Sequence, residues 1–231
     1  MKPLNSILSV GICFILFLPS KSVGQNKFIE YAFAPGTKCT TTHASPVTNG
    51  WMIPFNVSDC QDELIAYVNN NTGSIKYLPV LGNGATDAIV YDIIQTGPDE
   101  FVCAGFWGKT FDVIGLMSAM IYKMDSSGNV KWETLFGFNS GLLASFTRVV
   151  AAPDGSLYAL SPDRGYTNIA KTNTNGKKIW QKSFPNIADM VWTSKGLLLS
   201  DSSHLILVDT SGAIIKNFNF PRKLFSSLQK G

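Results

Sequence analysis

Histidine and cysteine, which carry much metal and nucleophile chemistry, are scarce in this 231-residue chain. It has two histidines, His43 and His204, and four cysteines, none of them closely paired. Residues at these separations do not make a zinc site. The G-x-S-x-G elbow, the H-E-x-x-H motif and a glycine-rich phosphate loop are missing as well. The sequence therefore predicts no metal site, no cofactor and no catalytic residue.

Long apolar runs are missing apart from one near the start, residues 7–19, which is short for a bilayer span. This run lies between a basic start and the small residues 22–24, which is the arrangement of a secretory signal peptide. We predict a leader over residues 1–24 and a secreted, periplasmic or cell-surface protein with no transmembrane segment once the leader is removed. The alternative is a lipoprotein, although Cys13 lies inside the apolar run rather than after it.

An excess of one charge is also missing. Removal of the leader takes Lys2 and Lys21 from the 19 basic residues and leaves 17 against 16 acidic residues, a net charge of +1. The remaining basic residues are scattered, so no nucleic-acid partner is predicted. The rest of the chain, 25–231, suits one all-β domain, and a hydrophobic content of 45% supplies a core.

Three cysteines remain after the leader. Cys39 and Cys60 would close a loop of about 20 residues, for which a disulfide contributes roughly 3 kcal/mol. Cys103 alternates with apolar neighbours in "EFVCAGF" and is expected to be a small buried residue. Because the number of cysteines is odd, Cys39 and Cys60 are a disulfide candidate whose pairing the sequence leaves open.

The segment "KMDSSGNVKWETLFG", residues 123–137, contains a strand end, a polar turn, a glycine and a second strand. Asn and Asp favour such turns by bonding the nearby backbone, and glycine adopts positive φ freely. An aromatic residue stands four positions after the turn glycine in three of the four copies, and Lys216 stands there in the last. The copies are 67–82, 123–137, 171–184 and 207–220, and the aromatic residues are Tyr77, Trp132 and Trp180.

Two alternating strands joined by a polar turn precede each of the last three copies. Four short strands per unit of about 40 to 50 residues are typical of a β-propeller. We therefore predict an all-β, β-propeller-like array of about four four-stranded blades that cover one another's faces. A run of hairpins in a β-sandwich is the alternative. The predicted units are 39–84, 85–139, 140–185 and 186–220.

The D-x-x-G-x-x-x-W pattern of Asp125, Gly128 and Trp132 resembles the repeat of PQQ-like (quinoprotein-like) propellers. The chain is also similar to propeller segments of exported Bacteroidota proteins. The resemblance covers about 39–220 and implies that tryptophans dock neighbouring blades, so Trp132 is expected to pack against the adjacent blade. Two features depart from the family. The third unit has Asn173 in place of the aspartate, and four units are fewer than such propellers usually have.

The two ends of the chain bear on whether a ring closes. Residues 26–35, "NKFIEYAFAP", resemble a detached outer strand that pairs with the C-terminal end, and residues 220–231 would begin a fifth unit. The alternatives are an open or incomplete arc, a truncated product, or a small ring closed by its ends. An open arc would expose apolar side chains and strand edges and would favour self-association.

Four charged residues fall on or just before the first strand of successive units: Asp87, Asp92, Arg148 and Asp189. The first strand lines the central channel of a propeller. These residues are therefore candidates for a shared site that binds a cation or a polar ligand. The alternative is a set of solvated charges at the channel mouth.

Two aromatic residues, Trp107 and Phe111, lie in the predicted long loop of the second unit and would stack on a sugar or seat a peptide. The alternative is a loop that folds back and buries them. His204, close to Asp201, is interpreted as part of a turn before a strand. Further aspartates lie in turns, where their side chains are expected to bond the backbone: Asp99, Asp125, Asp154 and Asp163.

We expect an exported, non-catalytic binding or scaffold module with an unidentified protein or polysaccharide partner. This expectation depends on the leader, the repeats and the missing catalytic motifs. One fold can serve many functions. The alternatives are therefore a quinoprotein-like or glycan-active enzyme with a channel site, and a truncated propeller without independent function.

Overall fold

The computed structural model describes residues 13–18, 27–31, 39–41, 43–57, 64–79, 87–108, 118–137, 145–163, 165–201 and 203–219. Every helix or strand assigned within these ranges is a β-strand, so the all-β prediction is confirmed. No helix long and apolar enough to cross a membrane occurs in the part of the chain that the structure describes.

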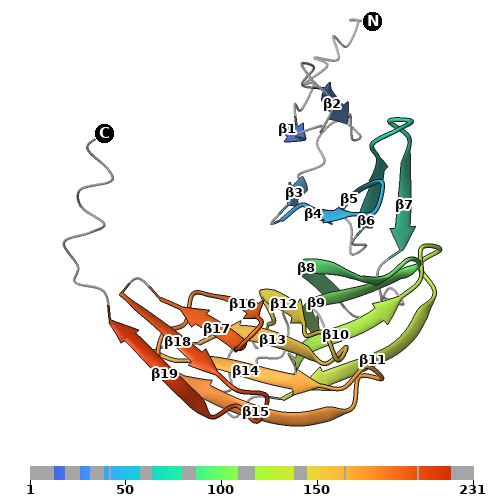
Figure 1. Ribbon diagram of the computed structural model, residues 1–231. Helices are drawn as coiled ribbons and strands as arrows, with labels where there is room; N and C mark the ends of the chain where they lie inside the picture. Colours follow the sequence, from blue (N-terminus) through green and yellow to red (C-terminus); the bar gives the residue numbers. More distant parts are fainter. Residues whose placement is uncertain are drawn as a thin grey trace, which may run out of the picture.

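Four blade-like antiparallel sheets follow one another along the chain (Figure 1), which confirms the predicted propeller-like array. In the first blade, two short strands share the innermost position and both pair with β5. Blade 1 contains β3 (Cys39–Thr41), β4 (Ser45–Val47), β5 (Gly50–Val57), β6 (Leu64–Asn69) and β7 (Ile75–Pro79). Blade 2 contains β8 (Asp87–Gly97), β9 (Glu100–Gly108), β10 (Ser118–Met124) and β11 (Val130–Phe136). Blade 3 contains β12 (Arg148–Ala151), β13 (Leu157–Pro162), β14 (Thr167–Thr172) and β15 (Lys178–Phe184), and blade 4 contains β16 (Asp189–Thr193), β17 (Gly196–Ser200), β18 (His204–Val208) and β19 (Ile214–Asn219).

The turn of each outer hairpin contains an Asp or Asn, whose side chain bonds the backbone, followed by a glycine. Asp125 Oδ1 accepts hydrogen bonds from the backbone amides two and four residues further on, at 2.8 and 3.0 Å. Asn173 Oδ1 accepts the equivalent pair at 3.0 and 2.9 Å, so asparagine replaces the aspartate of the repeat without loss of the turn. The turn glycines Gly128 and Gly176 have φ of +88° and +79°, a region that glycine adopts without strain.

Apolar side chains fill the space between successive blades. One cluster lies between blades 1 and 2, a second between blades 2 and 3, and a third between blades 3 and 4. Val102 and Cys103, neighbours on β9, belong to different clusters because successive side chains of a strand point to opposite faces. Cys103 is fully buried, as predicted.

Each of the first three outer hairpins also bonds to the turn of the following blade. The donor is a side chain on the last strand of one blade, and the acceptor is a backbone carbonyl in the next turn. The bonds are Lys76 Nζ to Ser126 O (2.8 Å), Thr134 Oγ1 to Gly176 O (2.7 Å) and Trp180 Nε1 to Thr210 O (3.0 Å).

Trp132 packs against the adjacent blade, as predicted. Its indole lies against Gly176, where an added methyl group would collide with the ring. The equivalent Tyr77 of the first blade is 47% exposed. In that blade the neighbouring Lys76 makes the docking bond instead.

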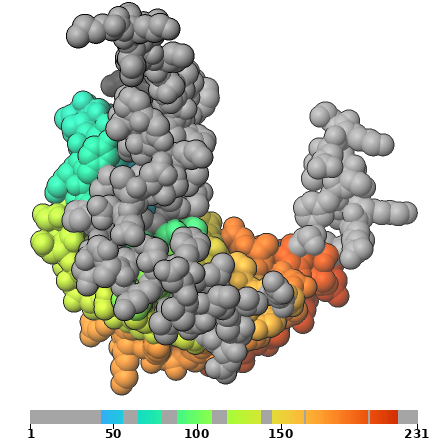
Figure 2. Space-filling model, turned by 180° about the vertical axis from the view of Figure 1, so that it is seen from behind, coloured from blue at the N-terminus to red at the C-terminus, as the bar shows by residue number. Residues whose placement is uncertain are grey.

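The blades form an open arc with blade 1 and blade 4 at its two ends (Figure 1), and Figure 2 shows the last blade at one end from behind. A separate two-stranded sheet pairs β1 (Cys13–Leu18) with β2 (Lys27–Tyr31). The expected pairing of residues 26–35 with the C-terminal blade is therefore wrong for β2. This strand lies beyond blade 1, at the other end of the arc (Figure 1). β1 lies within the predicted leader, and removal of the leader stays a prediction. The expected start of a fifth unit, residues 220–231, lies outside the described residues.

Candidate functional site

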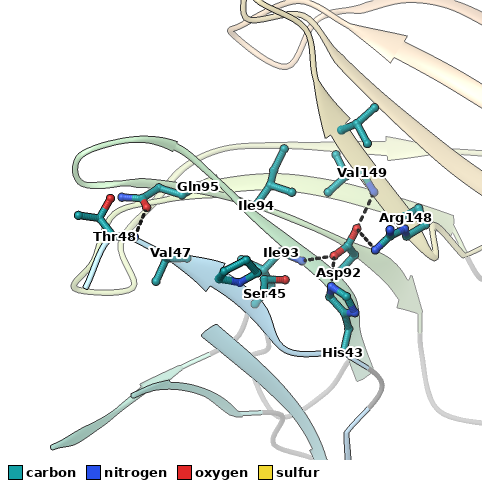
Figure 3. Close-up of a pocket in the computed structure, with 12 residues that line it drawn as sticks. His43, Ser45, Val47, Thr48, Asp92, Ile93, Ile94, Gln95, Arg148 and Val149 are labelled. Atoms are coloured by element: carbon teal, nitrogen blue, oxygen red, sulfur yellow. Dashed lines mark hydrogen bonds and ion pairs between the residues drawn. The ribbon is translucent and has the colours of Figure 1, made fainter. Parts of the chain in front are cut away.

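One ionisable side chain from each blade lies at the inner strands, and the four form a chain of contacts. Asp92 of β8 lies between His43, which precedes β4, and Arg148 of β12 (Figure 3). His43 Nε2 is 3.7 Å from Asp92 Oδ1, and Arg148 Nη1 is 3.8 Å from Asp92 Oδ2. Arg148 Nε donates a 2.9 Å hydrogen bond to Oδ1 of Asp189 in β16. Acidic and basic groups thus alternate from one blade to the next.

Asp92 is held at the boundary between the second and third blades. The pairing of β8 with β9 shifts register between Val90 and Asp92, and such a bulge redirects the side chains beside it. Asp92 is only 2% exposed. Its Oδ1 accepts a hydrogen bond from the Ile93 amide at 3.0 Å, and its Oδ2 accepts one from the Val149 amide at 2.9 Å. The carboxylate therefore joins β8 to β12.

The surroundings of Asp92 act on its charge in two directions. Burial raises the pKa of the carboxyl above its ordinary value, because the charged form loses hydration. The Val149 amide and the positive charges of Arg148 and His43 lower it, but by less. For Arg148, burial lowers the pKa of the guanidinium, but the hydrogen bond to Asp189 and the charge of Asp92 together raise it by more. The pKa therefore lies above its ordinary value, and the guanidinium stays charged.

A pocket of about 600 Å³ lies beside this chain of charges, where the inner strands of the first three blades meet (Figure 3). Its volume falls in the range of about 300–1,000 Å³ that is usual for small-molecule sites. Gln95 Oε1 accepts a 2.6 Å hydrogen bond from the Thr48 amide and so ties the first blade to β8 at the pocket wall. The lining is mixed, with Asp92, Arg148 and Gln95 as polar members and Val47, Ile94 and Val150 as apolar ones.

Two polar groups of the pocket wall have hydrogen-bonding capacity left, but they differ in whether a bound molecule can reach them. The Arg148 side chain is 35% exposed, and within the described residues its one hydrogen bond is the one that Nε donates to Asp189. Ser45 is 3% exposed, and its Oγ has no hydrogen-bond partner among the described residues. A buried hydroxyl without a partner is destabilising by about 1–3 kcal/mol. Because this Oγ has less than 1 Å² of accessible surface, only Arg148 of the two can reach a bound molecule.

The structure brings together three of the four charges that the repeats single out. Arg148 contacts both Asp92 and Asp189. All four residues lie on the first strands of their blades, as expected. The side chain of Asp87 lies outside the described residues, although its backbone begins β8. His43 was not singled out for this site. Its position just before the inner strands of the first blade is the signal that would have found it.

The other predicted residues do not join this site. Trp107 lies in β9 and packs against the core between blades 1 and 2, so its placement in a loop is wrong. The reason is that β9 continues to Gly108, with Trp107 paired to Ala88 on one side and Ser118 on the other. The remaining predicted groups lie outside the described residues: Phe111, Cys60 and the side chain of Cys39.

His204 is the first residue of β18, one residue beyond the turn in which it was predicted to lie, and its side-chain contacts are local. Asp201 Oδ2 is 2.8 Å from His204 Nδ1, and Ser203 Oγ lies 2.9 Å from the same nitrogen. In a serine triad the hydroxyl and the carboxylate contact different ring nitrogens. The cluster is therefore a turn and not a nucleophile site. Across the ranges that the structure describes, no group of three or more His, Cys, Asp or Glu residues could hold a metal ion.

No protein-family model matches the chain, and no curated protein matches it either. Function therefore has to be inferred from the pocket and its residues.

Proposed function

We propose that this protein is an exported, non-catalytic binding module of β-propeller type, and that the pocket beside Asp92 and Arg148 holds its ligand. The observation that carries this proposal is that the inner strands of three blades contribute polar side chains to one pocket of about 600 Å³. A few placed polar groups among apolar walls are typical of ligand sites. The predicted leader supports a location outside the cytoplasm.

The ligand that suits this pocket is a neutral, polar segment of a polysaccharide or of an extended protein chain. Arg148 is balanced by Asp92 and Asp189, so the pocket does not favour a polyanion. The guanidinium is a donor to hydroxyl and carbonyl oxygens. Val47 and Ile94 offer apolar surface to a sugar ring or a side chain.

The contacts of Asp92 support binding over catalysis. A general acid or base must reach the proton that it transfers, within hydrogen-bond distance of the substrate. Both oxygens of Asp92 instead accept backbone hydrogen bonds, and the residue is almost fully buried. Its role is to position Arg148 and to join the blades. Asp189 is the other carboxylate in this chain of contacts between blades, and it accepts a hydrogen bond from Arg148 Nε.

We also propose that the blades are related to PQQ-like repeats. The support comes from the turn of Asp125 and Gly128, and from the contacts that Trp132 and Trp180 make with the turn of the following blade. This relationship concerns the repeat, and it does not include a quinone cofactor.

The test is a binding screen of protein purified after export. Glycan and peptide arrays identify ligands, and titration calorimetry measures their affinity. Arg148→Ala is expected to weaken binding by about tenfold or more, since a hydrogen bond to a charged group contributes about 1.5–3 kcal/mol. Val47→Trp would fill the pocket without changing its charges and is expected to abolish binding. Lys195→Ala, an exposed cation in the turn between β16 and β17, is the control.

The outcomes separate the alternatives. Unchanged affinity in both folded pocket variants would place the ligand elsewhere and overturn the proposal. Turnover of a bound oligosaccharide or peptide would favour the enzyme alternative, and thermal unfolding of each variant shows whether it is folded.

A further inference from the structure

The proposed ligand pocket is walled by aliphatic side chains. Its described lining residues include Pro46, Val47, Ile94 and Val150, and none of those described is Phe, Tyr or Trp. A sugar ring packs best on the broad, flat surface of an aromatic ring, whereas branched aliphatic groups suit the side chains of a peptide. The apolar part of the wall therefore favours a protein segment over a polysaccharide.

Two polar side chains of this wall are already bonded within the protein. The two oxygens of Asp92 accept hydrogen bonds from backbone amides, at 3.0 and 2.9 Å. Gln95 Oε1 accepts one from the Thr48 amide at 2.6 Å, and its Nε2 donates to Gly97 O at 2.9 Å. A polysaccharide presents many hydroxyl groups, and each needs a hydrogen-bond partner when it is buried. Asp92 and Gln95 are not free to supply those partners.

The backbone of β12 supplies hydrogen-bonding groups that no described strand uses. Within the described residues this strand pairs with β13 alone. The Val149 amide donates to Asp92 and not to β13, so it points to the free edge. The N–H and C=O groups of one residue in an antiparallel strand point to the same side, and successive residues alternate. The carbonyl of Val149 and both backbone groups of Ala151 therefore face this edge.

Blade 3 presents a donor where blade 4 presents an acceptor. Asp189 begins β16 where Arg148 begins β12, in the matching register. Asp189 Oδ1 accepts a hydrogen bond from the Met190 amide at 2.8 Å, so blade 4 caps the first free amide of its own edge. Arg148 cannot accept a hydrogen bond, but its guanidinium donates to a carbonyl oxygen. Because an incoming strand presents carbonyl oxygens, the edge of β12 suits a peptide better than that of β16 does.

We propose that the ligand of the pocket is an extended, uncharged peptide segment that pairs as an added strand with the free edge of β12, an inference that rests on the proposed function. Main-chain hydrogen bonds to Val149 and Ala151 supply affinity, and alternate aliphatic side chains pack on Val47 and Ile94. Arg148 donates to a carbonyl of the peptide. The strand β12 lies on the concave side of the open arc (Figure 1), from which an extended chain can enter.

The experiment is titration calorimetry of the full exported chain with blocked hexapeptides in which Val, Ile or Leu alternates with Ser or Thr. These peptides are expected to bind. Peptides of the same composition with the aliphatic residues in one block are expected to bind about tenfold more weakly or worse. N-methylation of alternate amides removes the donors on one side of the strand. One of the two methylated sets should lose about tenfold or more in affinity, and the other should keep it.

Amide hydrogen exchange gives a measurement that needs no variant of the protein. The bound hexapeptide is expected to slow exchange in β12 and to leave exchange in β19, the outer strand of blade 4, unchanged. Equal losses of affinity in the two methylated sets, or unchanged exchange in β12, would overturn the assignment of a peptide to this edge.

The pocket variants separate the peptide ligand from the proposed function as a whole. Val47→Trp is expected to abolish binding of the hexapeptides, and Lys195→Ala is the control. Oligosaccharide binding that Val47→Trp abolishes, with no hexapeptide bound, would overturn the peptide ligand and leave the proposed function standing. Hexapeptide binding that Val47→Trp and Arg148→Ala both leave unchanged would overturn both.

Discussion

The indole of Trp132 in the second blade lies against Gly176 in the turn of the third. Two residues along β11, Thr134 donates its hydroxyl to Gly176 O at 2.7 Å. The turn glycine of the repeat therefore serves two purposes. It adopts a positive φ, and it leaves room for the tryptophan of the preceding blade. The tryptophan and the glycine of the repeated motif thus form a contact between blades.

Trp132→Ala is expected to lower the free energy of unfolding by about 2–4 kcal/mol. Loss of a fully buried tryptophan costs about 3–5 kcal/mol, and the value here is smaller because Trp132 is only partly buried. Urea unfolding gives the measurement. Val130→Ala, at an exposed site on the same strand, serves as the control and should change stability by less than about 0.5 kcal/mol. A loss below about 1 kcal/mol for Trp132→Ala would show that the docking contact is unimportant.

Gly176→Ala is expected to destabilise the protein more than Gly165→Ala does. The two glycines have nearly the same φ, +79° and +80°, so the backbone strain of alanine is matched at about 1–3 kcal/mol. An added methyl group meets Trp132 at Gly176 and nothing within 4 Å at Gly165. Unfolding of both variants, alone and combined with Trp132→Ala, isolates the collision. Equal losses in the two variants would contradict it.

Asp92→Ala is expected to destabilise the fold by about 2–4 kcal/mol. The change removes the acceptor of two backbone amides, including that of buried Val149, and each unpaired buried group costs about 1–3 kcal/mol. Asp189→Ala is the comparison, because its side chain is 53% exposed, and it should cost no more than about 1 kcal/mol. Similar losses for both variants, measured by thermal unfolding, would mean that Asp92 does not join the blades.

Glu100 is expected to make stability depend on pH in the acid range. Its carboxylate bonds Lys123 Nζ at 2.7 Å and Lys131 Nζ at 2.9 Å, and these bonds lower its pKa from 4.5 to about 2. Because the folded pKa lies below the unfolded one, the stabilisation is present above about pH 4.5 and is lost as the pH falls toward 2. Glu100→Gln should therefore be less stable than wild type at neutral pH.

The difference between Glu100→Gln and wild type should shrink as the pH falls below about 4.5 and disappear only below about pH 2, where the carboxyl is protonated in the folded protein as well. Urea unfolding at a series of pH values measures it. Glu133→Gln, on an exposed residue of β11, is the control for removing one acid. A difference that stays constant with pH would show that the two lysine contacts do not stabilise the fold.

The repeated blade could be predicted from the sequence because its signals are local. An Asx residue, a glycine and two alternating strands lie within one short segment, and Asp125 and Asn173 form the same turn. Trp107 was misplaced because the glycine after it suggested a loop, whereas pairing to β8 and β10 extends the strand through Gly108. The divided inner strand of blade 1 was not foreseen either, since no regular alternation marks β3 and β4.

The candidate site could be predicted only in part. The positions of Asp92, Arg148 and Asp189 on first strands follow from the repeat. Three features of the site could not be predicted from the repeat, because they depend on how one blade packs against the next. They are the bulge that redirects Asp92, the hydrogen bond from the Val149 amide to Asp92, and the approach of His43.

By itself, the sequence determined the all-β class, the number of blades and the turn that ends each outer hairpin, because short-range backbone preferences and strand alternation are sufficient for these. Only the tertiary structure decided that β2 pairs with β1 and that charged side chains from the four blades form one chain of contacts. These features arise from contacts between residues far apart in the chain. Their geometry depends on the packing angle between whole sheets, which no local pattern records.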